Sequence, residues 1–500
     1  MEEKIKHLKT LLNEVDDLNR AVSLLDWDQQ TYMPVGGTPG RSFSVATLSR
    51  LAHIKFTSPE IGRLLSDLKP YSSQLDPDSD DACLLKVTAR RYEKRTKVPP
   101  EWVAEFAHLT TAAHQVWQEA RAEANFKKFQ DILGKIIDLR RQYAGLFAPF
   151  DHIYDPLLDD FEPGMKTADV KAIFTALRPQ QVELIQAIKD RPQVDNTFLH
   201  QPFDEKKQWD FGVEVITKFG YDWKRGRQDK SAHPFTTDFG SGDVRITTRV
   251  NPNYLGTALF GTMHECGHAL YEQGINTRLD RTPLARGASL GLHESQSRTF
   301  ENLVGRSYNF WLHFYPRLQE YFPTQLGNMD LETFYKGINR VQPSLIRVEA
   351  DEATYNLHIM LRLELEIALL EGSLAVQDLP EAWNTRMQAY LGVTPPDDAL
   401  GVLQDVHWSG GMLGYFSTYA LGNLISAQLW ECVNADIPDL PEQIRQGHFT
   451  SLVGWMREKI HRHGGKFEPQ ELIQRITGSK IDPAPYIRYL QTKFGEIYGI

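Results

Sequence analysis

Cysteine is scarce in this sequence, which has only three in 500 residues: Cys83, Cys266 and Cys432. Three scattered cysteines are too few for a disulfide framework, and such thiols are typical of proteins kept in a reducing compartment. The sequence therefore predicts a cytoplasmic protein.

Long apolar runs and an excess of positive charge are also missing. No stretch approaches the roughly 18 consecutive apolar residues that a membrane span needs. The first segment, MEEKIKHLKTLLNEVDDL, has apolar residues at helical spacing but no apolar core of a signal peptide. The net charge is −10, which argues against nucleic acid as a partner. We therefore expect neither a membrane nor a nucleic acid as a partner.

The residues that are present describe a helical globular protein. Hydrophobic residues make up 41% of the chain and charged residues 24%. No repeat of fixed period is present, and we predict a mainly α fold in which residues 1–500 form a single unit. Helical periodicity is strongest over 1–25, 81–97, 101–148, 167–189, 253–273, 289–305 and 349–372.

One short β signal interrupts the helical pattern. HPFTTDFGSGDVRITTRV, at 233–250, has two extended segments around Gly240-Ser241-Gly242, with apolar alternation in the second. This pattern predicts a β-hairpin directly before the helix at 253–273. The edge of such a hairpin can pair with the backbone of an extended peptide.

The segment HECGHALYEQGI, which starts at His264, contains His-Glu-x-x-His. Residues four apart share one face of a helix, so His264 and His268 can bind one metal ion. The alternative is an ordinary helix that carries two histidines by chance. A catalytic zinc takes three protein ligands. Glu272 on the same helix is excluded, because eight residues at 1.5 Å each place it about 12 Å from His264.

The third ligand is therefore expected on another element, and GLHESQSRTFEN at 291–302 is the best source. We favour Glu294 over His293, since two histidines and one carboxylate are a common ligand set for hydrolytic zinc. Arg298 and Glu301 continue the same helix face and are predicted to orient the ligands.

Glu265 directly follows the first histidine, and its carboxylate is not needed as a metal ligand. Its carboxylate would lie beside the metal, where it can take a proton from a water molecule that the metal has activated. We therefore predict Glu265 as the general base; the alternative is a solvated helix acid.

Two further polar segments suggest contacts with a substrate. IRVEADEATYNLHI, at 346–359, predicts a polar stripe along one helix. In it Arg347 is either an ion-pair partner of Asp351 or a planar fork that binds the carboxylate of a peptide C-terminus. GVLQDVHWSGGMLGYFSTYALG, at 401–422, places His407 and Tyr419 around a Gly-Gly break. Such a segment suits oxyanion stabilisation, or is a structural loop with packed aromatic residues.

Six motifs occur in a distinctive order: His-Pro-Phe (233–235), Asp-x-Arg-x-Thr (243–247), His-Glu-x-x-His (264–268), His-Glu-Ser-Gln (293–296), Ile-Arg-x-x-Ala-Asp (346–351) and Gly-x-x-Gln-Asp-x-His-Trp (401–408). In order and spacing they resemble the thermostable carboxypeptidase Taq family of metallocarboxypeptidases, over nearly the whole chain.

The resemblance implies His264, His268 and Glu294 as metal ligands and Glu265 as the catalytic base. It implies a large helical zincin-type peptidase, mainly α, with a small antiparallel β element beside a deep active-site groove and two helical lobes around that groove. One divalent metal per chain is implied, zinc first and cobalt as the alternative. A homodimer is implied as well.

The resemblance also implies the reaction. Peptides with a free C-terminus would lose single C-terminal amino acids, with broad specificity but poor action on proline. Motif membership adds a looser set of substrate-binding or oxyanion contacts: His233, Arg245, Arg347, His407 and Tyr419.

The residues alone leave two other functions open. An endo-oligopeptidase uses the same metal set to cleave internal bonds. A non-catalytic peptide-binding protein would keep the metal helix as a vestige, although an intact Glu265 counts against it, because a binding module has no use for a base.

Overall fold

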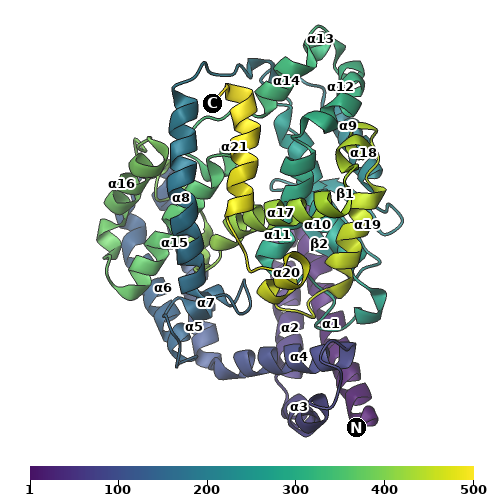
Figure 1. Ribbon diagram of the computed structural model, residues 1–500. Helices are drawn as coiled ribbons and strands as arrows, with labels where there is room; N and C mark the ends of the chain where they lie inside the picture. The colour runs from purple at the N-terminus through teal and green to yellow at the C-terminus, as the bar shows by residue number, and fades with distance from the viewer.

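A computed structural model describes residues 1–500, and the chain in it is built almost entirely of helices (Figure 1). The helices of the first half are α1 (Glu2–Thr31), α2 (Thr38–Phe56), α3 (Pro59–Ser72), α4 (Asp80–Lys97), α5 (Pro100–Ala122), α6 (Lys127–Gly145), α7 (Asp155–Leu158), α8 (Thr167–Lys189), α9 (Glu205–Phe219) and α10 (Gly256–Gly274). Those of the second half are α11 (Leu290–Arg298), α12 (Tyr308–Tyr321), α13 (Pro323–Leu326), α14 (Leu331–Ile338), α15 (Tyr355–Glu371), α16 (Leu379–Leu391), α17 (Ser417–Asp436), α18 (Leu440–Arg445), α19 (Thr450–Lys459), α20 (Pro469–Thr477) and α21 (Ala484–Tyr498).

Three of these helices, α10, α11 and α17, lie at the centre of the molecule (Figure 1). Helix α11 packs against both of the others. Helix α10 is buried along most of its length, with apolar contacts from Leu259, Met263, Cys266 and Leu270. The elements expected to carry a metal are therefore held from several sides by the core.

The helical prediction is confirmed for most segments and wrong in two details. The segment 101–148 is two helices, because the chain turns between α5 and α6, where Ala124 has a φ of 49°. The segment 346–359 is not one helix: Arg347 lies in a 3₁₀ turn, η5 (Arg347–Glu349), and α15 begins only at Tyr355. Asp351 accepts the backbone N–H groups of Ala353 and Thr354, which serves the start of α15.

The predicted hairpin is confirmed as β2 (Thr236–Asp238) and β3 (Val244–Thr248), which pair antiparallel with Thr236 opposite Ile246. The sheet also has a third strand, β1 (Gly226–Lys230), which pairs parallel with β3 and makes the sheet mixed. Strand β1 is not predicted by the sequence pattern, because GRQDK has no apolar alternation. The strand order is β1-β3-β2, so β2 is at an edge, and β3 packs on α10.

No helix combines the length and the apolar character that crossing a membrane requires.

The backbones of α10 and α11 touch at Gly267. A Cβ atom at this position would lie 2.5 Å from the carbonyl oxygen of Gln296 and 2.6 Å from the Cα of Ser297. Because backbone cannot move aside as the end of a flexible side chain can, any larger residue at 267 forces the two helices apart.

We expect Gly267→Ala to lower the melting temperature, since overpacking of this kind costs about 1–3 kcal/mol. Gly261→Ala is the matched control on the same helix, because a Cβ there meets nothing within 4 Å. It is expected to leave stability unchanged or to raise it by up to about 1 kcal/mol. Calorimetry of both variants checks this, and equal melting temperatures would contradict the close backbone contact.

Candidate metal centre

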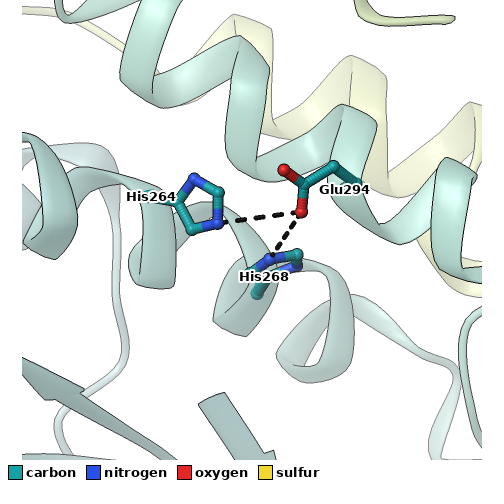
Figure 2. Close-up of side chains that lie close together, drawn as sticks. All are labelled: His264, His268 and Glu294. Carbon is teal, nitrogen blue, oxygen red and sulfur yellow. Dashed lines mark ion pairs between the residues drawn. The ribbon is translucent and has the colours of Figure 1, made fainter. Parts of the chain in front are cut away.

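Three side chains from two helices converge at the centre of the molecule. His264 and His268 lie one turn apart on α10, and Glu294 faces them from α11 (Figure 2). The Oε2 atom of Glu294 lies 3.7 Å from Nε2 of His264 and 3.4 Å from Nε2 of His268. One nitrogen or oxygen from each residue lies within 4.8 Å of the other two.

These distances fit a divalent metal ion. Zinc binds such atoms at about 2.0–2.2 Å, so two donors of one tetrahedral centre are about 3.4 Å apart. The measured separations are close to this value. The electrostatics agree: burial lowers the pKa of His264, but the carboxylates of Glu294 and Glu301 outweigh burial and raise it to about 9. The space between the three side chains therefore stabilises positive charge.

Glu301 fixes the orientation of His264. It lies in the π-helical turn η4 (Thr299–Val304), which continues α11. Nδ1 of His264 donates to Oε2 of Glu301 at 2.8 Å, which leaves Nε2 facing Glu294, with a lone pair for a metal ion once the ring is neutral. Burial alone would raise the pKa of Glu301, but the Arg298 guanidinium and the hydrogen bond from His264 lower it to about 2. Glu301 is thus a charged acceptor in contact with His264, as an orienting role would require.

His268 is oriented through a second histidine. Nε2 of His293 donates to Glu272 at 2.6 Å, so the Nδ1 of a neutral His293 is an acceptor. Nδ1 of His268 lies 2.5 Å from it and must be the donor. Nε2 of His268 therefore also presents its lone pair toward Glu294. Glu272, excluded as a ligand by distance, instead serves His268 from one step away.

Glu294 is held as firmly as the histidines. Its Oε1 accepts Nε of Arg298 at 2.7 Å, which leaves Oε2 for the two histidines. Helix α17 presses on its stem: a Cβ at Gly422 would lie 2.6 Å from the Cγ of Glu294. Although burial raises it, the pKa of Glu294 stays well below its ordinary value because of Arg298 and the histidines. The carboxylate is thus charged and immobile.

Glu265 lies beside this cluster and is tied to the sheet. Thr236 of β2 donates its hydroxyl to Oε2 of Glu265 at 2.7 Å, and the same hydroxyl lies 3.0 Å from the backbone oxygen of residue 265. Burial raises the pKa of this carboxyl above its ordinary value. Thr236 was not singled out by the sequence analysis, since nothing in the hairpin pattern marks one threonine among four.

A groove of about 710 Å³ opens over these residues. One side is formed by Phe235 and Thr236 of the hairpin, and another by Tyr415 and Tyr419 at the start of α17. Helix α4 forms a further wall, and its basic residues Lys86, Arg90, Arg91 and Lys94 face the groove. A groove of this size holds several residues of an extended peptide.

The sequence and the structure both match known carboxypeptidases. The family model for carboxypeptidase Taq (M32) metallopeptidases matches residues 7–494. Thermostable carboxypeptidase 1 of Thermus thermophilus is 42% identical over 489 residues, which cover 95% of each chain. The chain belongs to the carboxypeptidase Taq (M32) family. The family is one of metallocarboxypeptidases, so the chain is a peptide hydrolase, and the resemblance drawn from the six motifs is confirmed.

Other M32 relatives agree in sequence and in fold. Carboxypeptidase 1 of Bacillus subtilis is 37% identical over 494 residues, covering 99% of this chain and 98% of that one. The solved M32 carboxypeptidase of Deinococcus radiodurans is 40% identical, with a TM-score of 0.97 over the whole of both chains. Metallocarboxypeptidase 1 of Trypanosoma cruzi is 34% identical, with a TM-score of 0.94 over 99% of this chain and all of that one. The mainly α, zincin-type fold is that of the M32 family.

The residues predicted to contact the substrate or the oxyanion differ in their position relative to the groove. Tyr419 lines the groove, and its hydroxyl donates to the hydroxyl of Tyr415 at 3.3 Å. His233 is exposed on the loop before β2 and is not among the lining residues, whereas its neighbours Pro234 and Phe235 are. Arg245 faces α1: it donates to Asp243 and stacks 4.4 Å from the ring of Trp27.

Arg347 and His407 lie behind the tyrosine wall of the groove. Arg347 donates to Oδ1 of Asp405 at 2.8 and 3.0 Å and lies 5.2 Å from the ring of Tyr419. His407 packs against Tyr415 with tilted rings whose centres are 5.2 Å apart, and burial lowers its pKa to about 4. In this structure both side chains support the wall and do not line it.

The carboxylates behind the histidines are expected to raise metal affinity. Glu301→Gln and Glu272→Gln should each weaken metal binding by about 10- to 100-fold, because each removes the charged acceptor that orients a ligand. Glu468→Gln is the control, since Glu468 lines the groove and contacts neither histidine. Competition with a metal-binding dye measures the affinities. If Glu301→Gln and Glu272→Gln bind the metal as tightly as Glu468→Gln, the orienting role is contradicted.

Proposed function

We propose that this chain is a metal-dependent carboxypeptidase that removes single amino acids from the free C-terminus of peptides, with His264, His268 and Glu294 as the metal ligands. The observation that carries the proposal is the convergence of these three donors, within 4.8 Å of one another, at a groove that Glu265 also lines. Zinc is the favoured metal, because two histidines and one carboxylate are a usual set for hydrolytic zinc; cobalt is the alternative.

Each part of the site has a defined task in this proposal. A bound divalent ion supplies a Lewis acid that polarises the peptide carbonyl and lowers the pKa of water. Glu265 takes the proton of the attacking water and returns it to the leaving amine. Thr236 holds one oxygen of Glu265, so the other oxygen is free for the proton.

The substrate is placed between the sheet and the tyrosine wall. An extended peptide pairs with the free edge of β2, next to the residue that holds Glu265. The hydroxyl of Tyr419, with Tyr415 beside it, is a donor for the negative charge that develops on the carbonyl oxygen.

Arg347, His407, Arg245 and His233 belong to the proposal as contacts further from the metal. Arg347 would bind the terminal carboxylate after leaving Asp405, or act by positioning Tyr419. Broad specificity with poor action on proline is part of the same proposal, because a proline after the cleaved bond has no N–H and a rigid ring.

Residues 1–500 are proposed to act as one catalytic unit, since the apolar core joins residues from Ile5 to Tyr498. A cytoplasmic location is supported by three cysteines that form no disulfide. A homodimer is supported by a group of exposed apolar residues on α2 and on the turn between α1 and α2. This group comprises Tyr32 at 60%, Val35 at 91%, Phe43 at 75% and Ile54 at 53% exposure.

A peptide and its C-terminally amidated twin distinguish the activities. With zinc or cobalt supplied, we expect stepwise loss of residues from the free form only, followed by mass spectrometry. Internal fragments from both peptides would indicate an endo-oligopeptidase. Absence of cleavage, with binding retained, would indicate a peptide-binding protein.

Glu265→Gln tests the base. Removal of a general base lowers kcat by about 10²- to 10⁴-fold, while the metal content should stay at one ion per chain, since Glu265 is not among the three converging donors. Kinetics and elemental analysis of the same preparation check both expectations. Full activity in this variant would refute the assignment.

A further inference from the structure

A second recess adjoins the groove. It has a volume of about 290 Å³ and lies between α1, α4 and the loop that precedes α11. Arg91 of α4 and Arg286 of the loop line both spaces, so they form the border between recess and groove. A side chain of a peptide in the groove can therefore enter the recess past these two arginines.

Three arginines of the recess have no carboxylate partner. Arg91 makes no ion pair, whereas its groove-facing neighbours Arg90 and Lys94 pair with Asp159. Arg95 lies over the ring of Phe56 at 5.0 Å, is exposed to solvent, and makes no ion pair either. Such unpaired guanidinium groups in one recess are a site for an anion.

Arg286 is the most exceptional of the three. Desolvation by the neighbouring protein lowers its pKa to about 10, and only the charge of Asp16 opposes this. The side chain nevertheless remains accessible to solvent. A guanidinium that is unpaired and lies at the border between recess and groove can bind a charged ligand.

The acidic residues of the recess do not cancel this charge. Asp16 is paired with Arg20, at 2.6 Å. Burial and the neighbouring Glu272 raise the pKa of Asp238 to about 7, so this carboxyl is only partly ionised at neutral pH. The recess therefore keeps a net positive charge near Arg91, Arg95 and Arg286.

We propose that this recess is a subsite for an acidic side chain of the peptide substrate, whose carboxylate is bound by Arg91, Arg95 and Arg286. The inference rests on the proposed carboxypeptidase activity. It gives that activity a preference for Asp or Glu near the C-terminus, because a carboxylate bound by unpaired arginines gains hydrogen bonds that an amide of the same size does not.

The test compares peptides that differ by Glu or Gln at one of the last three positions. At one position, wild-type kcat/KM should be about tenfold higher for Glu than for Gln. Arg286→Gln and Arg91→Gln should remove this preference and leave cleavage of the Gln peptide unchanged. Arg281→Gln is the control: it lies on the same loop, but is exposed and paired with Asp17.

Each outcome decides the proposal. Equal cleavage of Glu and Gln peptides at all three positions, or a preference that survives in both variants, overturns it. An equal loss for Glu and Gln peptides in Arg286→Gln also overturns it, and would assign the recess to the terminal carboxylate. Calorimetric binding of the Glu and Gln peptides to Glu265→Gln tests the recess without turnover. Failure of the carboxypeptidase proposal is seen separately, as no cleavage of any peptide.

Discussion

The contact between the backbones of α10 and α11 is the constraint on which the metal centre depends. One helix brings two donors and the other brings the third, so the distance between the helices sets the distance between the donors. Gly267 allows that distance, because any Cβ there would overlap the backbone of Gln296 and Ser297. Gly422 has the same effect from the other side, where α17 presses against the stem of Glu294. Small residues thus determine the geometry of the site as much as its ligands do.

The second requirement of the metal centre is that its carboxylates stay charged although they are buried, and hydrogen-bonded partners meet this requirement. Arg298 donates to both Glu294 and Glu301, and Glu301 accepts from His264. The site therefore places two ionised carboxylates and one guanidinium around two histidines whose Nε2 atoms point inward. Burying such groups is costly unless each has a partner. A divalent cation completes the set, since it supplies the positive charge that the inward-facing donors lack.

The fold class and the placing of His264 and His268 on one helix face could be predicted from the sequence because their signals are local, and the resemblance to a family added Glu294. His-Glu-x-x-His depends on helical spacing alone, and the hairpin depends on alternation within one short segment. What could not be predicted depends on contacts between distant segments. Arg347 was assigned to a helical stripe, but its position is set by Asp405, which lies 58 residues later. Strand β1 has no apolar pattern and exists through its pairing with β3. The sequence likewise cannot show that Arg286 has no ion-pair partner, because this depends on which distant side chains the fold brings near it.

Strand β2 is only three residues long, and this shortness has a consequence for recognition. Three residues span about 10 Å, and an edge strand directs its N–H and C=O groups outward only at alternate residues. A peptide laid along β2 is thus guided over about two residues, and its more distant part has no backbone track to follow. So short a strand is suited to binding the last residues of a peptide. The rest of the peptide makes no backbone contact with β2, so its length does not affect this part of the binding.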